Sequence, residues 1–311
     1  MNSRNRDMWQ ETSDGLMAAS RAAHAGHAAR GTRHPAGFTL IELLVVISIM
    51  GIIAALSVPA LKNLGKSNIT VSAGRQLLDD VGHARQLAIS QHTTVYMVFV
   101  KTNFWLAPTF PNPWWNQLTS PQQTAATNLC DKQLTGYTFV SLRSVGDQPG
   151  RGTPRYLAAA WHNLPDGTFI AAQKYVTPGT VVSSQAQPLF SYWNQYYPHP
   201  DQNKIYAFAT NTIPFPTETS PSVPMPYIAF NYLGQLTFDG VNLSTRDEYI
   251  PLAQGSVSPA MDVATKTFVI SAARSPSVSE TPPGNSTNSM YNIVHIDRLT
   301  GRATLEYQKV R

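Results

Sequence analysis

The chain has 311 residues, of which 42% are hydrophobic and only 13% are charged. Its net charge of +5 gives no more than a mild preference for acidic partners. The single cysteine, Cys130, excludes an internal disulfide and a zinc site built from cysteines.

The first predicted element is an apolar helix within GFTLIELLVVISIMGIIAALSVPAL, residues 37–61. Residues 38–61 carry one charge, Glu42, and about 20 apolar residues are enough to cross a bilayer. We therefore predict a transmembrane helix over 38–61. Two alternatives stay open: a core helix of a soluble protein, which should show a polar face, and a secretory signal, which should have a shorter apolar part. Basic residues are balanced on the two sides, so the orientation is not decided.

Glu42 is the unusual residue of this segment. A carboxylate inside hydrocarbon costs on the order of 3 kcal/mol, so such a residue normally has a partner. No cation of the same helix lies within reach, which indicates a partner on another chain or at a newly made terminus. A position of Glu42 at the level of the lipid headgroups is the alternative.

The segment 37–61 closely resembles the N-terminal signature of type IV prepilins and of the pseudopilins of type II secretion. In that family a prepilin peptidase cuts after the glycine, here Gly37, and the new N-terminus, here Phe38, is methylated. The resemblance implies that Glu42 pairs with the terminal amine of a neighbouring subunit. This pairing would supply the missing cation from another chain.

The family also tends to place a glycine and a proline within the helix, here Gly51 and Pro59. Both residues weaken a helix locally, which suits a segment that bends or partly unwinds when it is packed. The resemblance makes residues 1–37 a leader peptide, with Met8 or Met17 as other starting points. Ala36 departs from the pattern, because the family usually has a basic residue directly before the cleaved glycine.

A second, amphipathic half of the helix is predicted over 62–92. Its apolar residues recur at steps of three and four, which places them on one face of a helix that continues to about Gln91. An amphipathic helix of a separate soluble domain is the alternative. The stripe consists of Ile69, Ala73, Leu77, Val81, Ala84 and Ala88.

The stretch VGHARQLAISQHTTVYMVFV, residues 81–100, resembles the minor pseudopilin H of type II secretion and its type IV pilus counterparts, the GspH/FimT-like group. Arg85 within this stretch is equally compatible with an ordinary exposed cation. The resemblance implies an α+β pilin-like fold, in which the long N-terminal helix packs on an antiparallel β-domain.

From residue 93 the period changes to that of strands rich in β-branched and aromatic residues. Residues 93–311 are therefore predicted to form one globular β-rich domain with long loop insertions. The segments 226–240 and 292–308 are expected to be hairpins. Strands are predicted at 93–100, 137–143, 167–172, 226–240, 266–272 and 292–308. Loops are predicted at 103–127, 183–201, 212–226 and 275–289.

Two of these loops concentrate aromatic residues, in PNPWWNQ (111–117) and SYWNQYYPHP (191–200). Such residues suit an exposed surface that binds carbohydrate or a partner protein. The alternative, aromatic side chains that fix long loops onto the sheet, is favoured.

No sequence motif indicates an enzyme, a cofactor or a metal site, because HExxH, P-loop, GxSxG and GxGxxG patterns are all missing. His162 near Asp166 and His199 near Asp201 have neither a third ligand nor a nucleophile signature. The C-terminal run 297–311 carries four cations against two acids, which is a weak footprint for DNA. These cations are Arg298, Arg302, Lys309 and Arg311.

The sequence therefore predicts a minor pilin or pseudopilin of the bacterial inner membrane, with one membrane pass and a periplasmic β-domain. The partners implied by the resemblance are the prepilin peptidase and methyltransferase, other pilin or pseudopilin subunits, the inner-membrane assembly platform and the lipid bilayer. The alternative is a membrane-tethered binding protein, for carbohydrate or DNA, that uses a pilin-like anchor. Glu42, Gly51 and Pro59 are the expected assembly residues.

Overall fold

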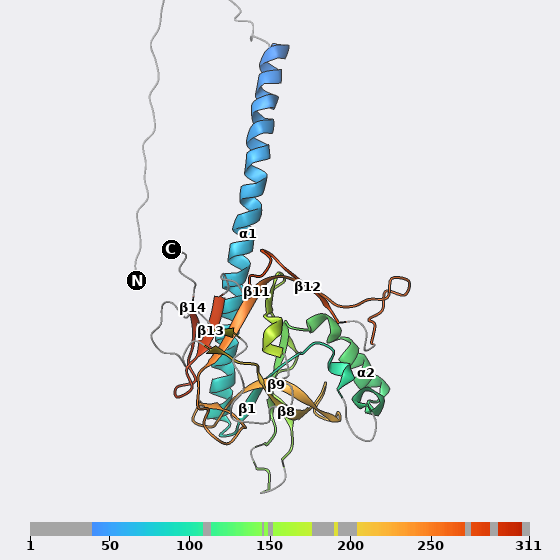
Figure 1. The fold of residues 1–311 in the computed structure, drawn as a ribbon, viewed down its shortest axis with the longest axis vertical. Coiled ribbons are helices and arrows are strands. Elements are labelled where there is room, and N and C mark those ends of the chain that lie inside the picture. Colours follow the sequence, from blue (N-terminus) through green and yellow to red (C-terminus); the bar gives the residue numbers. More distant parts are fainter. Residues whose placement is uncertain are drawn as a thin grey trace, which may run out of the picture. The chain divides into compact units, whose positions relative to one another are not determined.

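The computed structural model describes residues 39–107, 113–144, 146–148, 152–175, 190–191, 204–270, 275–286 and 292–306. The chain divides into two compact units, 1–55 and 56–311. The described part of the first unit is Thr39 and the start of the long helix α1 (Leu40–Ser90), and the second unit contains the rest of α1 and all of the strands. Figure 1 shows the elements in sequence colours.

Within the second unit, one face of α1 is buried against the strands. Five members of the predicted stripe, from Ala73 to Ala88, are fully buried, whereas Ile69 at its edge is 36% exposed. The helix ends where His92 adopts a left-handed φ of 48°, and the Thr93 amide then donates to the Ala88 carbonyl. The prediction that the helix continues to about Gln91 is confirmed to within one residue.

The larger sheet has seven strands and is antiparallel throughout. Its main order is β10-β9-β1-β2-β3, while β8 pairs with β9 and β4 pairs with β2. Its strands are β1 (Val95–Phe99), β2 (Gly136–Ser141), β3 (Arg155–Tyr156), β4 (His162–Asn163), β8 (Ala209–Pro214), β9 (Ser222–Phe230) and β10 (Leu236–Thr237).

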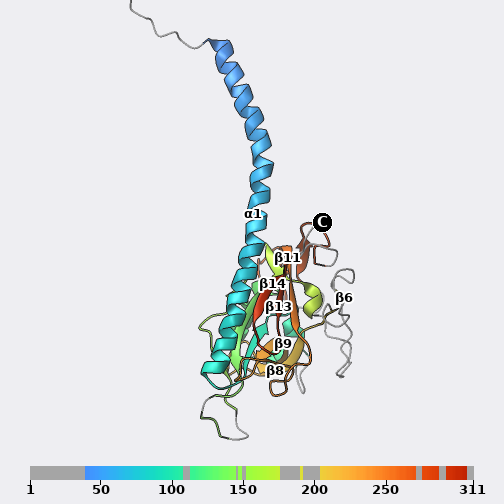
Figure 2. The same cartoon turned by 90° about the vertical axis from the view of Figure 1, so that its left-hand side faces the viewer.

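The second sheet has five antiparallel strands in the order β12-β11-β13-β14, with β5 on β11. A short pair of β6 and β7 stands apart from it. Figures 1 and 2 both show β13 and β14 beside the C-terminal half of α1. The strands are β5 (Thr168–Ile170), β6 (Phe190–Ser191), β7 (Lys204–Ile205), β11 (Glu248–Ser258), β12 (Ser277–Glu280), β13 (Asn292–Ile296) and β14 (Ala303–Glu306).

The alternation of side chains along β1 gives the domain two hydrophobic layers. Val95, Met97 and Phe99 join the cluster under α1, together with residues of the second sheet. Tyr96 and Val98 point to the opposite face, which is covered by short helices. Because both faces of β1 are buried, its sequence VYMVF is apolar at every position. The covering helices are η1 (Phe104–Leu106), η2 (Trp114–Gln117), α2 (Ser120–Thr127) and η3 (Cys130–Lys132), and η4 (Ala172–Tyr175) lies elsewhere.

The expected hairpins at 226–240 and 292–308 are confirmed as β9–β10 and β13–β14. The strand predicted at 266–272 is wrong for the described residues 266–270, which form only the isolated bridge Met261↔Phe268. Lys266 there adopts a left-handed φ of 53°, and the Asp262 carboxylate accepts the backbone amides of the turn before it. These hydrogen bonds hold the backbone in a turn, and the turn interrupts the strand.

Two predicted loops contain strands. Of residues 212–226, 212–214 end β8 and 222–226 begin β9, and only 215–221 connect the two strands. The prolines that suggested a loop, Pro224 and Pro226, occur where β9 pairs only with β8. Proline is tolerated at such an edge since no second neighbour needs its amide. The predicted loop 275–289 contains β12. The predicted loop 183–201 lies outside the described residues, apart from β6.

Candidate assembly helix and its processing motif

Glu42 has a partner in its own chain, which the sequence interpretation missed. The Glu42 carboxylate accepts two hydrogen bonds from Thr39 through Oε2, from the backbone amide and the hydroxyl, each at 2.8 Å. The Glu42 amide in turn donates to Thr39 Oγ1 at 3.3 Å. This reciprocal arrangement is a capping box, which satisfies amides that the first turn of a helix leaves unpaired. The spacing Thr-x-x-Glu was the signal that could have predicted it.

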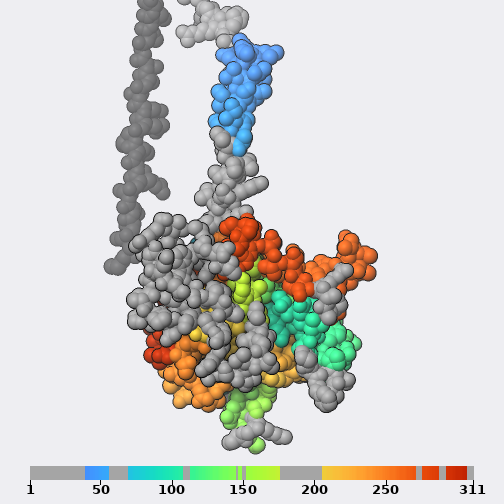
Figure 3. Space-filling model, in the orientation of Figure 1, coloured from blue at the N-terminus to red at the C-terminus, as the bar shows by residue number. Residues whose placement is uncertain are grey.

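The large apolar side chains on both sides of Glu42 in the described start of α1 are exposed. The large apolar residues from Leu40 to Ile53 are between 42% and 82% exposed, and they form the blue surface in Figure 3. Exposed apolar surface on this scale marks a place where another apolar phase or another protein is bound.

Gly51 and Pro59 both lie inside α1. A side chain at Gly51 would meet nothing within 4 Å, so its glycine is not required by contacts within this chain. Gly74, further along the same helix, differs: a Cβ there would lie 2.9 Å from a methyl carbon of Leu305. Pro59 does not end the helix, which is continuous from Leu40 to Ser90.

The predicted processing residues, Gly37 and Phe38, lie outside the described residues, so their roles stay predictions. Across the residues that the structure describes, no helix combines the length and the apolarity needed to cross a bilayer. The assignment of 38–61 as transmembrane is therefore a prediction as well.

The second half of α1 is fixed to the β-domain by polar contacts in addition to its apolar stripe. Gln76 Nε2 donates to the Tyr137 hydroxyl at 3.0 Å and to the Asn163 carbonyl at 2.9 Å. The Tyr137 hydroxyl donates to Asp80 Oδ2, which also lies 3.2 Å from His162 Nδ1. Burial and the bond to Asp80 raise the pKa of Tyr137, so its phenol stays protonated. His162 thus contacts Asp80 rather than its sequence neighbour Asp166.

The C-terminal half of the helix also contacts a turn of the second sheet. Arg85 Nε donates to the Thr300 carbonyl at 2.7 Å, in the turn between β13 and β14. The interpretation of Arg85 as an ordinary exposed cation is therefore incomplete, because this side chain joins the helix to the second sheet.

The aromatic residues of the first predicted binding loop are mostly internal. Trp114 is fully buried, its indole nitrogen donates to the Pro221 carbonyl at 3.0 Å, and its ring lies 5.5 Å from that of Phe215. Phe104 and Trp105 are buried in the same layer. These rings fix the loop to the sheet, as the favoured alternative predicted. The second aromatic stretch, 191–200, lies outside the described residues beyond Ser191.

Of the four cations of the C-terminal run, the structure describes two, Arg298 and Arg302. Arg298 donates to the Thr245 carbonyl, whereas Arg302 is exposed. Lys309 and Arg311 lie outside the described residues. Within the described parts of the chain, no group of three or more His, Cys, Asp or Glu side chains could hold a metal ion.

Comparison with known proteins gives one match. Residues 32–58 match a family described as the prokaryotic N-terminal methylation motif. This match covers Gly37, Phe38, Glu42 and Gly51, and it supports the prepilin and pseudopilin family. No curated protein and no solved structure matches the chain. The motif indicates a structural, membrane-anchored protein that is processed by prepilin peptidase and assembled with other pilins.

Proposed function

We propose that this chain is a minor pilin or pseudopilin, cleaved after Gly37, methylated at Phe38 and assembled through α1 into a type IV pilus or a type II secretion pseudopilus. The match of residues 32–58 to the methylation motif carries the proposal, because the motif contains the cleavage point, the methylated residue and Glu42. The GspH/FimT-like pattern at 81–100 favours a low-abundance initiating or tip subunit.

The exposure of the first half of α1 supports two successive environments for this surface. In the inner membrane, residues 38–61 would span the bilayer once, with the β-domain in the periplasm. In the filament, the same apolar side chains would contact the helices of neighbouring subunits. Either environment removes apolar surface from water, which is favourable by about 25 cal/mol for each Å² buried.

The geometry at Glu42 is compatible with a further bond to a neighbouring subunit. Both Thr39 bonds use Oε2. Among the described residues nothing donates to Oε1, so this oxygen remains for the methylated terminal amine of another subunit. We infer that Glu42 caps its own helix and sets the position of the adjacent chain at the same time.

A tethered binding protein, which borrows the helix only as an anchor, is the second candidate. A pocket in the β-domain favours it, and the two functions can coexist in one chain. They differ in what they require of Glu42, since a tethered protein needs no partner amine.

Two substitutions at Glu42 separate these functions. Glu42→Ala removes both the cap and the charge, whereas Glu42→Gln keeps an oxygen for Thr39 and removes only the charge. We expect both variants to be absent from sheared filaments or pseudopili, as measured by immunoblotting of the filament fraction, while their amounts in the membrane are unchanged. Incorporation of Glu42→Gln at the level of the unsubstituted protein would contradict the pairing with a neighbouring amine.

A further inference from the structure

We propose that a pocket in the second unit binds a zwitterion that joins a quaternary ammonium group to an anion, of which phosphocholine is the simplest example. This inference goes beyond the proposed assembly function and does not depend on it. The pocket has a volume of about 570 Å³, within the range of about 300–1,000 Å³ that is usual for small-molecule sites. Its walls come from α2 and η3, from β2, from the β3–β4 connection and from the loop after β8.

Two aromatic rings form one part of the pocket. The centroids of Tyr156 and Trp161 lie 6.0 Å apart and their planes meet at 56°, so the two rings are tilted against each other and not stacked. Both rings are held in place: the Tyr156 hydroxyl donates to the Pro214 carbonyl at 2.7 Å, and Trp161 makes an edge contact with Phe215 at 5.4 Å. The faces of such rings attract a quaternary ammonium group through their quadrupoles.

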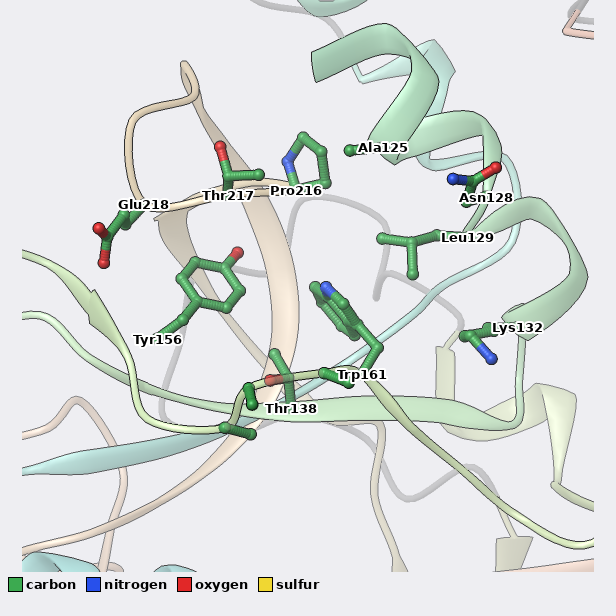
Figure 4. A pocket seen from close by; sticks show the side chains of 13 residues that line it. Ala125, Asn128, Leu129, Lys132, Thr138, Tyr156, Trp161, Pro216, Thr217 and Glu218 are labelled. Atoms are coloured by element: carbon green, nitrogen blue, oxygen red, sulfur yellow. The ribbon is translucent and has the colours of Figure 1, made fainter. Parts of the chain in front are cut away.

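The charged side chains are separated across the pocket. Figure 4 shows Glu218 on the same side as Tyr156, and Lys132 and Asn128 on the opposite side, with Trp161 between them. Burial and the nearby charge of Glu218 both raise the pKa of Tyr156, which agrees with this placement. Among the described residues, none donates to Glu218 or accepts from Lys132 or Asn128 through their side chains.

This distribution selects the chemical class of the ligand. Glu218 and the two rings offer a cation site, while the Lys132 ammonium and the Asn128 amide offer an anion site. A simple anion would be repelled by Glu218, and a simple cation would leave Lys132 without a counter-charge. A neutral sugar would neutralise neither charge. A zwitterion can neutralise both the Glu218 carboxylate and the Lys132 ammonium.

The remaining walls suit the methyl groups of a quaternary ammonium. Leu129, Pro216 and alanines of α2 and of the β3–β4 connection form their apolar part, and Thr217 adds a hydroxyl. The Thr138 hydroxyl beneath Trp161 is buried and, among the described residues, has no hydrogen-bond partner. Such an oxygen is uncommon in a folded protein and here it borders the pocket.

Isothermal titration of the full chain in dodecyl maltoside micelles tests the proposal with three probes: phosphocholine, choline and inorganic phosphate. We expect phosphocholine to bind with a dissociation constant of about 1 mM or tighter, choline more weakly, and phosphate weakest of the three. Absence of saturable phosphocholine binding would overturn the proposal, and so would phosphate binding that is as tight.

Substitutions then locate the site. Lys132→Ala should weaken phosphocholine about threefold to tenfold and leave choline unchanged, whereas Glu218→Gln should weaken both ligands by a similar factor. Trp161→Ala should weaken both about tenfold or more, and Trp161→Phe, which keeps a ring and the packing on Phe215, should weaken them less. Asp166→Asn and Arg302→Ala are matched charge controls on exposed residues outside the pocket, and equal effects of the controls would refute the location.

Vesicles distinguish a lipid headgroup from a free zwitterion as the source of the ligand. The full chain in nanodiscs of phosphatidylglycerol is mixed with vesicles of phosphatidylcholine, and flotation is measured with and without Lys132→Ala. Flotation that this variant abolishes supports a headgroup ligand. Phosphocholine binding without flotation supports a soluble one.

Discussion

The two halves of α1 use apolar residues in opposite ways. Leu77 and Val81, in the second half, are fully buried under the sheets of the same chain, and polar residues beside them bond to the β-domain. In the first half, Ile47 is 60% exposed and Met50 is 65% exposed, and the large apolar side chains around them are exposed as well. One helix therefore has a half whose apolar stripe is buried within the second unit and a half whose apolar side chains are exposed.

The glycines of the helix show the same difference. A Cβ at Gly74 would press on Leu305, whereas a Cβ at Gly51 would meet nothing. A small residue in the second half is explained by close packing within the chain. In the first half its explanation must come from a neighbouring molecule or from bending of the helix.

The largest effect is expected from shortening matched apolar residues in the two halves. Leu77→Ala leaves a cavity in the core and should lower the free energy of unfolding by about 2–5 kcal/mol. Ile47→Ala should change it by less than about 0.5 kcal/mol, since its side chain is 60% exposed. Chemical denaturation of the full chain in micelles, followed by the near-ultraviolet signal of the β-domain, measures both, and equal losses would break the comparison.

The polar attachment of the second half gives the next largest effect. Asp80→Ala removes the acceptor of the Tyr137 hydroxyl and a partner of His162, so it should lower the free energy of unfolding by about 1–3 kcal/mol. Asp79→Ala, one residue earlier on the exposed side of the helix, is the matched control and should be nearly neutral. The same denaturation experiment measures both variants; a neutral Asp80→Ala would mean that the apolar stripe alone holds the helix.

Two glycine substitutions sharpen the comparison further. Gly82→Ala has open space for the new methyl group and should stabilise the protein by up to about 1 kcal/mol through its helix propensity. At Gly74 the displacement of Leu305 opposes this gain, so Gly74→Ala should be less stable than Gly82→Ala. Thermal unfolding of the pair provides the measurement. The reverse order would show that the contact between α1 and β14 is loose.

The smallest effect is expected from His295 in β13 of the second sheet. Burial alone would lower the pKa of His295, but hydrogen bonds to Glu306 and Asp247, at 2.8 and 3.0 Å, raise it overall. The pKa of His295 in the folded protein therefore lies above its unfolded value of about 6.5. The stabilisation that protonated His295 gives to the folded state is complete below pH 6.5 and is lost as the pH rises through the folded pKa.

We therefore expect the stability advantage over His295→Gln to be less than about 1 kcal/mol and to decline as the pH rises above about 6.5. Unfolding curves of both proteins at several pH values give this difference. An advantage that grows with pH would contradict the placement of His295 between two carboxylates.

Much of the fold was predictable because local patterns and tertiary packing agree. The stripe from Ala73 to Ala88 has a period that only a helix with one buried face explains, and the sequences around β1, β2 and β5 are rich in strand-forming residues. The β8–β9 pair was missed because proline signals a loop locally, and only the pairing partner reveals that Pro224 and Pro226 stand at an edge.

The candidate sites were predictable to different degrees. Glu42 was identified by its improbable position in an apolar helix, yet its bonds to Thr39 required recognition of the capping box. The pocket around Trp161 could not be predicted, because Lys132, Tyr156 and Glu218 come from separate segments and no spacing connects them. Aromatic residues in the loops suggested binding, but Trp114 proved to be internal and Trp161 was not singled out.

The most direct test of the account is mass spectrometry of the N-terminus of the mature chain, isolated from native membranes of cells with and without prepilin peptidase. The account predicts a chain that begins at N-methylated Phe38 and that is lost when the peptidase is missing. A chain that keeps residues before Gly37 in the presence of the peptidase, or one that is cut near Ala60, would contradict it.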